Sequence, residues 1–312
     1  MLRTNNLGYP RIGNLRQLKR SNEAFWSNKI TANELIDQGK EIRRNNWFLQ
    51  KDLNIDLIPS NDFSFYDQML DTSLMLGAIP PRFHQLVDGK GTERELKLYF
   101  AMARGCQSDN EDITPQEMTK WFDTNYHYLV PEFAKAQKFS LFSEKVINEF
   151  SEAKELGILT KPVMIGPLTY LLLGKEKEEG FHRLDLLEEI LPVYIEVLKR
   201  LKDLGAEYVQ FDEPCLVTDL DKKALNAYIN AYKKIAEETI GLKLIVATYF
   251  GGLRENINTV INLPIHTLHI DLVRDEKALE NVLPLLPSEL NISLGIVDGR
   301  NIWKNDFDSS LQ

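Results

Sequence analysis

Six short apolar runs occur after residue 54, and amphipathic stretches separate them. The runs span residues 55–59, 162–167, 208–211, 244–249, 268–273 and 292–297. Between two of the runs, apolar side chains recur every three or four positions from Leu184 to Leu204, which predicts an amphipathic helix. Apolar strands that alternate with helices are typical of a parallel sheet buried on both faces. The pattern therefore predicts an α/β fold.

The segment 1–51 predicts a strand, a turn and a pair of helices. Residues 7–10 are expected to form a first strand, and Gly13 lies in the turn that precedes the first helix. The second helix is expected to start at Thr31, because Thr31 and Glu34 have the spacing of a capping box. These helices precede the remaining strands and helices, which occupy residues 52–312.

Polar residues follow nearly every apolar run, and this favours one kind of α/β fold. In a (β/α)8 barrel, functional groups gather at the carboxyl ends of the strands. With residues 7–10 as the first strand, seven strands are predicted, whereas a closed barrel of this kind needs eight. Either a further strand lies near residues 121–128, or the chain ends before the barrel closes. The fold predicted is a TIM-type (β/α)8 barrel that lacks its last strand, forming a single domain over residues 1–312.

The segment 61–130 is rich in aromatic residues and too long for a simple connection. We interpret it as an insertion at the mouth of the barrel, because long loops in compact domains are frequently functional.

Charge and cysteine content restrict the function classes. The net charge is −9, which argues against a general nucleic-acid-binding protein. Residues 1–51 contain ten Lys or Arg and four Asp or Glu, a local net charge of +6 that suggests an anion site. No run of 18 apolar residues predicts a membrane span. The chain has two widely separated cysteines and no apolar signal region, so we expect a reducing, cytoplasmic location.

Two segments have the composition of a binding site for a ligand with carboxylates. Arg16, Lys19 and Arg20 follow a glycine turn at the start of a helix, where cations and free N–H groups favour carboxylate or phosphate. In residues 118–128, Lys120 and Asn125 alternate with aromatic side chains, which suits a flat heteroaromatic ligand. The alternatives are a solvated helix face for the first segment and an aromatic core strand for the second.

Carboxylates and histidines at the predicted strand ends allow further hypotheses. Asp212 and Glu213 could act as acid and base, but neighbours on a strand point to opposite faces, so a salt bridge or a cap is the alternative. His269 and Asp271 share a face and could bind a metal, although a hydrogen-bonded histidine explains the pattern as well. No dinucleotide, nucleoside-triphosphate or serine-hydrolase motif is present.

Nine segments along the chain carry a resemblance, namely 7–13, 16–19, 57–63, 66–67, 118–128, 166–167, 210–214, 247–250 and 297–303. In these segments, which occur in order, the chain resembles the N-terminal half of cobalamin-independent methionine synthase along essentially its whole length. The eleven residues 118–128, Met-Thr-Lys-Trp-Phe-Asp-Thr-Asn-Tyr-His-Tyr, are the most specific of these.

The resemblance implies an activity and a division of labour. The family transfers a methyl group from 5-methyltetrahydropteroyltriglutamate to homocysteine in methionine biosynthesis, without cobalamin. Its C-terminal barrel carries the zinc through a His-x-Cys pair, a Glu and a further Cys, and this motif is absent here. We therefore expect this chain alone to be an inactive part of a methyltransferase, with no catalytic and no metal-binding residue of its own. Its partners are expected to be the folate substrate and the C-terminal barrel, with no nucleic acid and no membrane.

The family's folate-contacting positions carry over to six residues. They are Arg16, Gln17, Leu18, Lys19, Lys120 and Asn125, where Gln17 departs from the acidic residue usual in the family. By resemblance, they hold the polyglutamate tail of the folate. Two other hypotheses remain: a non-catalytic structural or interaction barrel that docks to another chain, and a free-standing hydrolase that uses Asp212, Glu213 and Asp271.

Overall fold

The structure, a computed structural model, describes residues 2–87, 92–108 and 111–310. Short parts of the predicted insertion, at 88–91 and 109–110, and the two ends of the predicted domain 1–312 lie outside the described residues. Among the described residues, no helix is long and apolar enough to cross a membrane.

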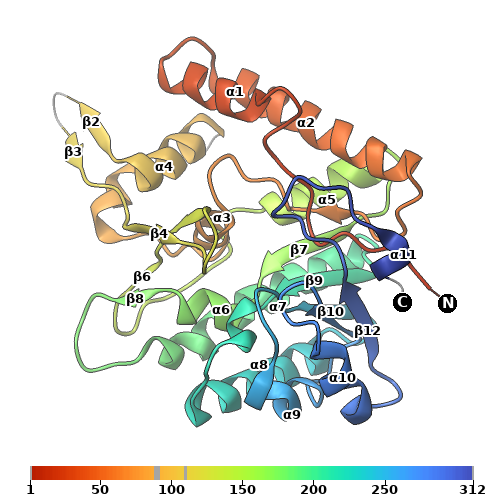
Figure 1. Cartoon of the computed structure of the whole chain (residues 1–312). Helices are drawn as coiled ribbons and strands as arrows, with labels where there is room; N and C mark the ends of the chain where they lie inside the picture. The colour runs from red at the N-terminus through yellow and green to blue at the C-terminus, as the bar shows by residue number, and fades with distance from the viewer. Residues whose placement is uncertain (1, 88–91, 109–110, 311–312) are drawn as a thin grey trace.

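A parallel sheet of six strands forms the centre of the molecule (Figure 1). The strands are hydrogen-bonded in the order β1-β7-β9-β10-β11-β12, and every neighbouring pair is parallel. They span Pro59–Ser60 (β1), Lys161–Ile165 (β7), Tyr208–Asp212 (β9), Lys243–Ala247 (β10), Thr267–Asp271 (β11) and Asn291–Gly295 (β12). Each apolar run of the sequence therefore contributes one strand, as predicted, and the α/β fold is confirmed.

The two faces of this sheet differ in polarity because side chains alternate along each strand. On one face, Phe211, Val246 and Ile270 belong to the largest apolar cluster, together with Tyr194 of α7 (Leu187–Asp203) and Tyr228 of α8 (Lys222–Glu238). The residues one position away, among them Gln210, Asp212 and His269, face the other side. The helices thus cover the apolar face, and the polar side chains, which are also buried, lie on the opposite face.

The predicted helix 184–204 is confirmed with a change at its start. Residues Arg183–Leu186 form a 3-10 turn (η2), and α7 begins at Leu187 and continues through Pro192.

The pair of helices at the N-terminus is confirmed, but the strand predicted at residues 7–10 is wrong. The helices are α1 (Gln17–Trp26) and α2 (Ala32–Asp52), and Thr31 and Glu34 form the predicted capping box. In place of the strand, a single parallel bridge joins Asn5 to Leu57. The N–H of Tyr9 donates to the Asp62 carboxylate at 2.7 Å, and Pro10 has no N–H to offer, so these residues cannot extend a ladder.

The described strands do not close into a barrel. In the described ranges, no strand joins β12 to β1, so the sheet is an open α/β sheet with a parallel core. The suggestion of a further sheet strand near 121–128 is also wrong. These residues belong to a separate antiparallel hairpin of β4 (Met118–Lys120) and β5 (His127–Leu129), because their ladder bonds pair with each other.

The aromatic-rich insertion has an apolar core of its own. This second cluster includes Leu70, Phe83, Tyr99 and Phe100, and Leu35 of α2 packs against them. The insertion contains α3 (Gln68–Met75), η1 (Pro81–Leu86), α4 (Thr92–Arg104) and the hairpin of β2 (Cys106–Ser108) and β3 (Glu111–Ile113). In Figure 1 these elements lie on the side of the molecule next to α1, away from α8 and α9.

Shorter elements complete the fold. They are β6 (Glu132–Phe133), α5 (Lys145–Glu155), α6 (Pro167–Leu172), β8 (Lys175–Glu176), η3 (Pro214–Val217), η4 (Arg254–Asn256), α9 (Ile257–Val260), α10 (Ala278–Val282), η5 (Leu283–Leu285) and α11 (Phe307–Ser310).

Candidate functional site

The N-terminus of α1 concentrates positive charge and has no acidic residue in its first turn. Arg16 occupies the N-cap in the left-handed region, with φ 59°, and its side chain caps no backbone N–H. The first turn holds no Asp or Glu, whereas Lys19 lies within it, and both Arg16 and Lys19 are exposed. The positive end of a helix dipole stabilises anions and disfavours cations. This helix start is therefore suited to an anionic ligand.

The other two residues predicted on α1 have structural contacts. The Gln17 side chain accepts a hydrogen bond from the N–H of Leu15 at 2.8 Å. Leu18 is 4% exposed and packs with Ile42 and Phe63. The Leu18 side chain therefore fixes α1 to α2 and to the segment after β1, while Arg16 and Lys19 are the exposed side chains of this part of the candidate site.

A shallow groove of about 500 Å³ runs between α1 and α2 beside this helix start. Its lining mixes polar and charged side chains, among them Gln17, Arg20 and Glu41. Lys19 forms an exposed ion pair with Glu23 at 3.7 Å, one turn further along α1. An exposed pair of this kind is weak, so it leaves the Lys19 ammonium able to bind a stronger anion.

Lys120 and Asn125 lie on either side of the tip of the β4–β5 hairpin. Lys120 is paired with His127 across the hairpin, and the N–H of Trp121 donates to the Tyr126 carbonyl at 2.8 Å. Both Lys120 and Asn125 are exposed. Three of the four aromatic side chains of this segment face the molecule instead: Trp121 and Tyr128 belong to the main apolar cluster and Phe122 packs against it, whereas Tyr126 is exposed. The hairpin thus combines the two interpretations of residues 118–128: an aromatic core side and an exposed polar side.

The segment 61–67, which sequence reasoning did not assign to the site, lies between α1 and this hairpin. The Asn22 side chain of α1 donates to the Phe65 carbonyl at 2.7 Å. On the other side, the Asp67 carboxylate accepts from the N–H of Leu129 in β5 at 3.2 Å and caps α3. Within the described ranges, no hydrogen bond or ion pair joins α1 directly to the hairpin. A shared ligand for Lys19 and Lys120 therefore remains a prediction.

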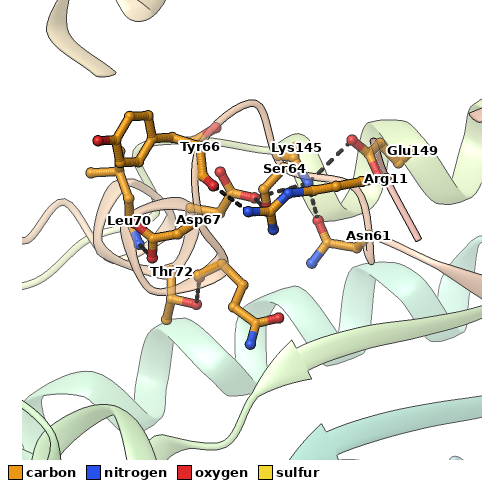
Figure 2. Close-up of polar contacts among 12 residues, drawn as sticks. Arg11, Asn61, Ser64, Tyr66, Asp67, Leu70, Thr72, Lys145 and Glu149 are labelled. Carbon is orange, nitrogen blue, oxygen red and sulfur yellow. Dashed lines mark hydrogen bonds and ion pairs between the residues drawn. The ribbon is translucent and has the colours of Figure 1, made fainter. Parts of the chain in front are cut away.

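Figure 2 shows how this segment is held. The Arg11 guanidinium donates to the Tyr66 carbonyl. Burial raises the pKa of Asp67 to about 7, while its hydrogen bonds with the α3 N–H groups and the charge of Arg11 act against the rise. Arg11 is one of the ten basic residues of segment 1–51, but its contact with residue 66 could not be found from spacing.

Behind this segment, a buried charge cluster fixes the end of β1 against α2 and α5. The Lys145 ammonium lies 3.3 Å from Asp71 and 3.2 Å from Glu149, and it donates to the Asn61 side chain at 2.8 Å (Figure 2). Arg43 of α2 lies 3.5 Å from the same Glu149. The partners of these charges are one another, so the cluster is structural.

Asp212 and Glu213 lie on opposite faces of the sheet and do not form one site. Glu213 is completely buried and accepts hydrogen bonds from the N–H groups of Leu168 and Thr169 and from the hydroxyls of Tyr228 and Tyr232. Burial raises the pKa of Glu213 to about 7. With four donors around it, this carboxyl joins the start of α6 to α8. The capping alternative is therefore the correct one for Glu213.

Asp212 belongs to a polar network on the face of the sheet opposite α7 and α8. It accepts from the Gln210 amide at 2.7 Å and from the Tyr249 hydroxyl at 3.1 Å, and Gln210 in turn binds the buried Lys161. Asp271 accepts the N–H of Phe250 at 3.0 Å and those of two residues in its own turn. The three carboxylates are thus separately bound, and the hypothesis of a hydrolase built from them is wrong.

His269 is hydrogen-bonded rather than arranged as a metal ligand. Its Nδ1 lies 2.9 Å from the Ser293 hydroxyl, and burial lowers its pKa to about 3. Within the part of the chain that the structure describes, no group of three or more His, Cys, Asp or Glu could hold a metal ion. Burial also raises the pKa of Cys215 to about 12, which disfavours the thiolate that zinc prefers.

These features define an α/β protein with an open parallel sheet, exposed cationic side chains at the start of α1 and a hairpin with an exposed Lys120. A model of the cobalamin-independent synthase N-terminal domain matches residues 3–312. The chain therefore belongs to the cobalamin-independent methionine synthase family and corresponds to its N-terminal domain.

Individual relatives agree with this assignment. A 5-methyltetrahydropteroyltriglutamate–homocysteine methyltransferase of Flavobacterium johnsoniae is 56% identical over 313 residues, which cover 100% of this chain and 40% of that protein. One of the same name from Cytophaga hutchinsonii is 54% identical and is also covered to 40%. The chain thus spans about 40% of the length of these relatives.

Solved structures support the fold. The putative vitamin-B12-independent methionine synthase of Listeria monocytogenes superposes with a TM-score of 0.65 at 14% identity, covering 99% of this chain and 84% of that one. A B12-independent methionine synthase of a Shewanella species gives a TM-score of 0.55 at 15% identity, with 86% and 73% covered.

Proposed function

We propose that this chain is the N-terminal part of a methyltransferase that moves a methyl group from 5-methyltetrahydropteroyltriglutamate to homocysteine. In this proposal its own role is to bind the polyglutamate tail of the folate through Arg16, Gln17, Leu18, Lys19, Lys120 and Asn125. The observation that carries the role is the start of α1, where Arg16 and Lys19 are exposed at the positive end of a helix with no acid in its first turn. A tail with several carboxylates supplies the missing negative charge.

The chemistry of methyl transfer is assigned to the C-terminal barrel, outside this chain. A zinc ion there would supply a thiolate nucleophile at neutral pH. The described residues of this chain do not fit zinc, because the Cys215 thiol is held protonated and no His, Cys, Asp and Glu cluster has the required arrangement. The chain alone is then inactive, and no cobalamin takes part.

The same proposal concerns architecture and location. Residues 1–312 form one domain, and the open sheet is an incomplete (β/α)8 barrel whose last strand would pair beside β12. The exposed side chain of Leu294 on β12, at 40%, is consistent with a surface that a further segment covers. The reducing, cytoplasmic location suggested by the sequence belongs to this proposal as well.

Calorimetry with the full-length gene product tests the tail-binding role. Triglutamate folate should bind more tightly than monoglutamate folate, and Lys19→Ala or Lys120→Ala should weaken triglutamate binding about threefold to tenfold at low salt, since each removes one exposed charge contact. Lys233→Ala is the matched control, because Lys233 forms a similar exposed ion pair one turn apart on α8, with Glu237 at 4.0 Å. Equal affinity for the two folates would refute the role and favour the alternative of a purely structural barrel.

A further inference from the structure

The tip of the β4–β5 hairpin is tied to two loops that follow strands of the main sheet. The Asp123 carboxylate accepts a hydrogen bond from Arg274, in the loop after β11. Arg300, in the loop after β12, places its guanidinium 3.5 Å from the same carboxylate oxygen and donates to the Asp123 carbonyl at 3.3 Å. We call these three residues the Asp123 clamp. Arg274 lies 151 positions and Arg300 lies 177 positions after Asp123 in the sequence, so only the fold brings the three residues together.

Each of the two arginines lies in a turn whose backbone is bound by an aspartate of the same turn. The N–H of Arg274 donates to Asp271 at 3.1 Å, and the N–H of Arg300 donates to Asp298 at 2.9 Å. Each capping carboxylate thus binds the backbone, while both guanidinium groups converge on Asp123. Arg300 in the turn 298–301 therefore pairs with Asp123 of the hairpin.

An aromatic contact reinforces the clamp. The ring centroids of Phe122 and Phe250 are 5.5 Å apart, and those of Phe122 and Trp121 are 5.2 Å apart. Phe122 and Phe250 both have left-handed backbones, with φ 51° and 77°. For side chains with a Cβ this conformation costs about 1 kcal/mol or more and persists only where the surroundings enforce it. The tip conformation therefore depends on its contacts with the loop after β10 and with the two arginines.

We propose that Asp123 is a positioning residue for the tail-binding site: by binding Arg274 and Arg300, it holds the hairpin so that Lys120 and Asn125 meet the ligand's carboxylates. This inference rests on the proposed function of those two residues. Lys120 lies three positions before Asp123 and Asn125 two positions after it, within the tip that the clamp fixes. Without the clamp, the ligand would have to order Lys120 and Asn125 when it binds. The conformational entropy lost in that step would lower its affinity.

The test uses Asp123→Asn in the full-length gene product, which keeps the shape of the side chain and removes its charge. The KM for triglutamate folate should rise about threefold to tenfold, as expected for one charge-assisted contact at a half-exposed site, with kcat and the KM for homocysteine unchanged. Amide hydrogen exchange of residues 118–129 should become faster. Asp123→Glu should restore much of the affinity. Glu238→Gln is the control, because Glu238 is 50% exposed and pairs with Lys199 at 2.6 Å on the helical face.

Each outcome decides a separate question. If Lys120→Ala raises the KM for triglutamate and Asp123→Asn does not, the clamp has no positioning role. Tighter triglutamate binding by Asp123→Asn would also overturn the inference, because Asp123 would then compete with the ligand for the two arginines. If neither substitution alters the KM for triglutamate, the proposed function itself fails, whatever the exchange rates show.

Discussion

Asp212 and Glu213 show how much a single residue's role depends on the strand that carries it. Neighbouring side chains on a strand point to opposite faces, so the sequence offered a salt bridge or a cap as the alternative to a shared acid–base site. The structure confirms this, with Glu213 among α6 and α8 and Asp212 in the network of Gln210 and Tyr249. Which donors surround each carboxylate was not predictable, because Tyr228 and Thr169 come from distant parts of the chain.

His269 gives a prediction at the residue scale. Its folded-state pKa of about 3 lies below the ordinary value of 6.5, so between these values the unfolded state binds a proton that the folded state excludes. This group alone should therefore lower the free energy of unfolding by about 1.5 kcal/mol as the pH decreases from 6.5 to 5. Urea unfolding of the chain at both pH values measures the change.

The matched variant for this measurement is His269→Asn, whose amide can still reach the Ser293 hydroxyl. The change in the free energy of unfolding on going from pH 6.5 to pH 5 should be more favourable in this variant than in the unmodified chain by about 1.5 kcal/mol. Asp67 and Glu213 have raised pKa values and contribute slopes of the opposite sign, but they are present in both proteins and cancel in the difference. Identical slopes in the two proteins would show that His269 is protonated in the folded state.

At the scale of elements, α1 and α2 begin in opposite ways. The start of α2 is satisfied internally, because Thr31 accepts from the N–H of Glu34 and Glu34 accepts from the N–H of Thr31. The start of α1 has Arg16 at its N-cap and no side-chain cap. The capped start of α2 is a structural feature, and the start of α1, which lacks a side-chain cap, is the candidate for ligand binding.

The cap of α2 gives a prediction at this scale. Thr31→Ala removes the hydroxyl that accepts from Glu34 and should lower the free energy of unfolding by about 1 kcal/mol. Asn33→Ala, in the same exposed first turn, is the comparison, and it should have almost no effect or stabilise slightly because Ala favours helix. Chemical denaturation of both variants measures the difference, and equal stabilities would mean that the cap contributes nothing.

At the scale of the whole molecule, Asn5 and Asn6 connect parts of the sheet that are far apart in its strand order. Asn5 bridges to Leu57 near β1, and its side-chain amide donates to the Ser293 hydroxyl of β12 at 3.3 Å. The next carbonyl, that of Asn6, accepts from the buried Lys161 ammonium at 3.0 Å. Burial lowers the pKa of Lys161 to about 7, so this ammonium depends on its few acceptors.

Deleting residues 1–6 should therefore lower the free energy of unfolding by about 2 kcal/mol or more, because a buried donor loses its acceptor and the edge near β1 loses its bridge. A chain that starts at Arg3 is the control, since the side chain of Leu2 is 96% exposed and has little to lose. Thermal and urea unfolding measure both. A deletion that unfolds like the control would show that the bridge is dispensable.

The sequence by itself determined the α/β class, the six strands, the two N-terminal helices and the cap at Thr31. All of these follow from local patterns, namely the spacing of apolar side chains and hydrogen bonds between residues three positions apart. It also determined the family, because the segment 118–128 is specific as a string of residues. The strand expected at 7–10 was wrong, because the N–H of Tyr9 is used by Asp62, a residue 53 positions away.

Only the tertiary structure decided which distant groups meet. The placement of segment 61–67 between α1 and the hairpin, the enclosure of Glu213 and the convergence of Arg274 and Arg300 on Asp123 all join residues from separate elements. Long-range contacts of this kind depend on how helices and loops pack on the sheet. Which distant residues meet leaves no periodic signal in the chain. The sequence thus named the cationic residues of the candidate site, and the fold decided what holds them in place.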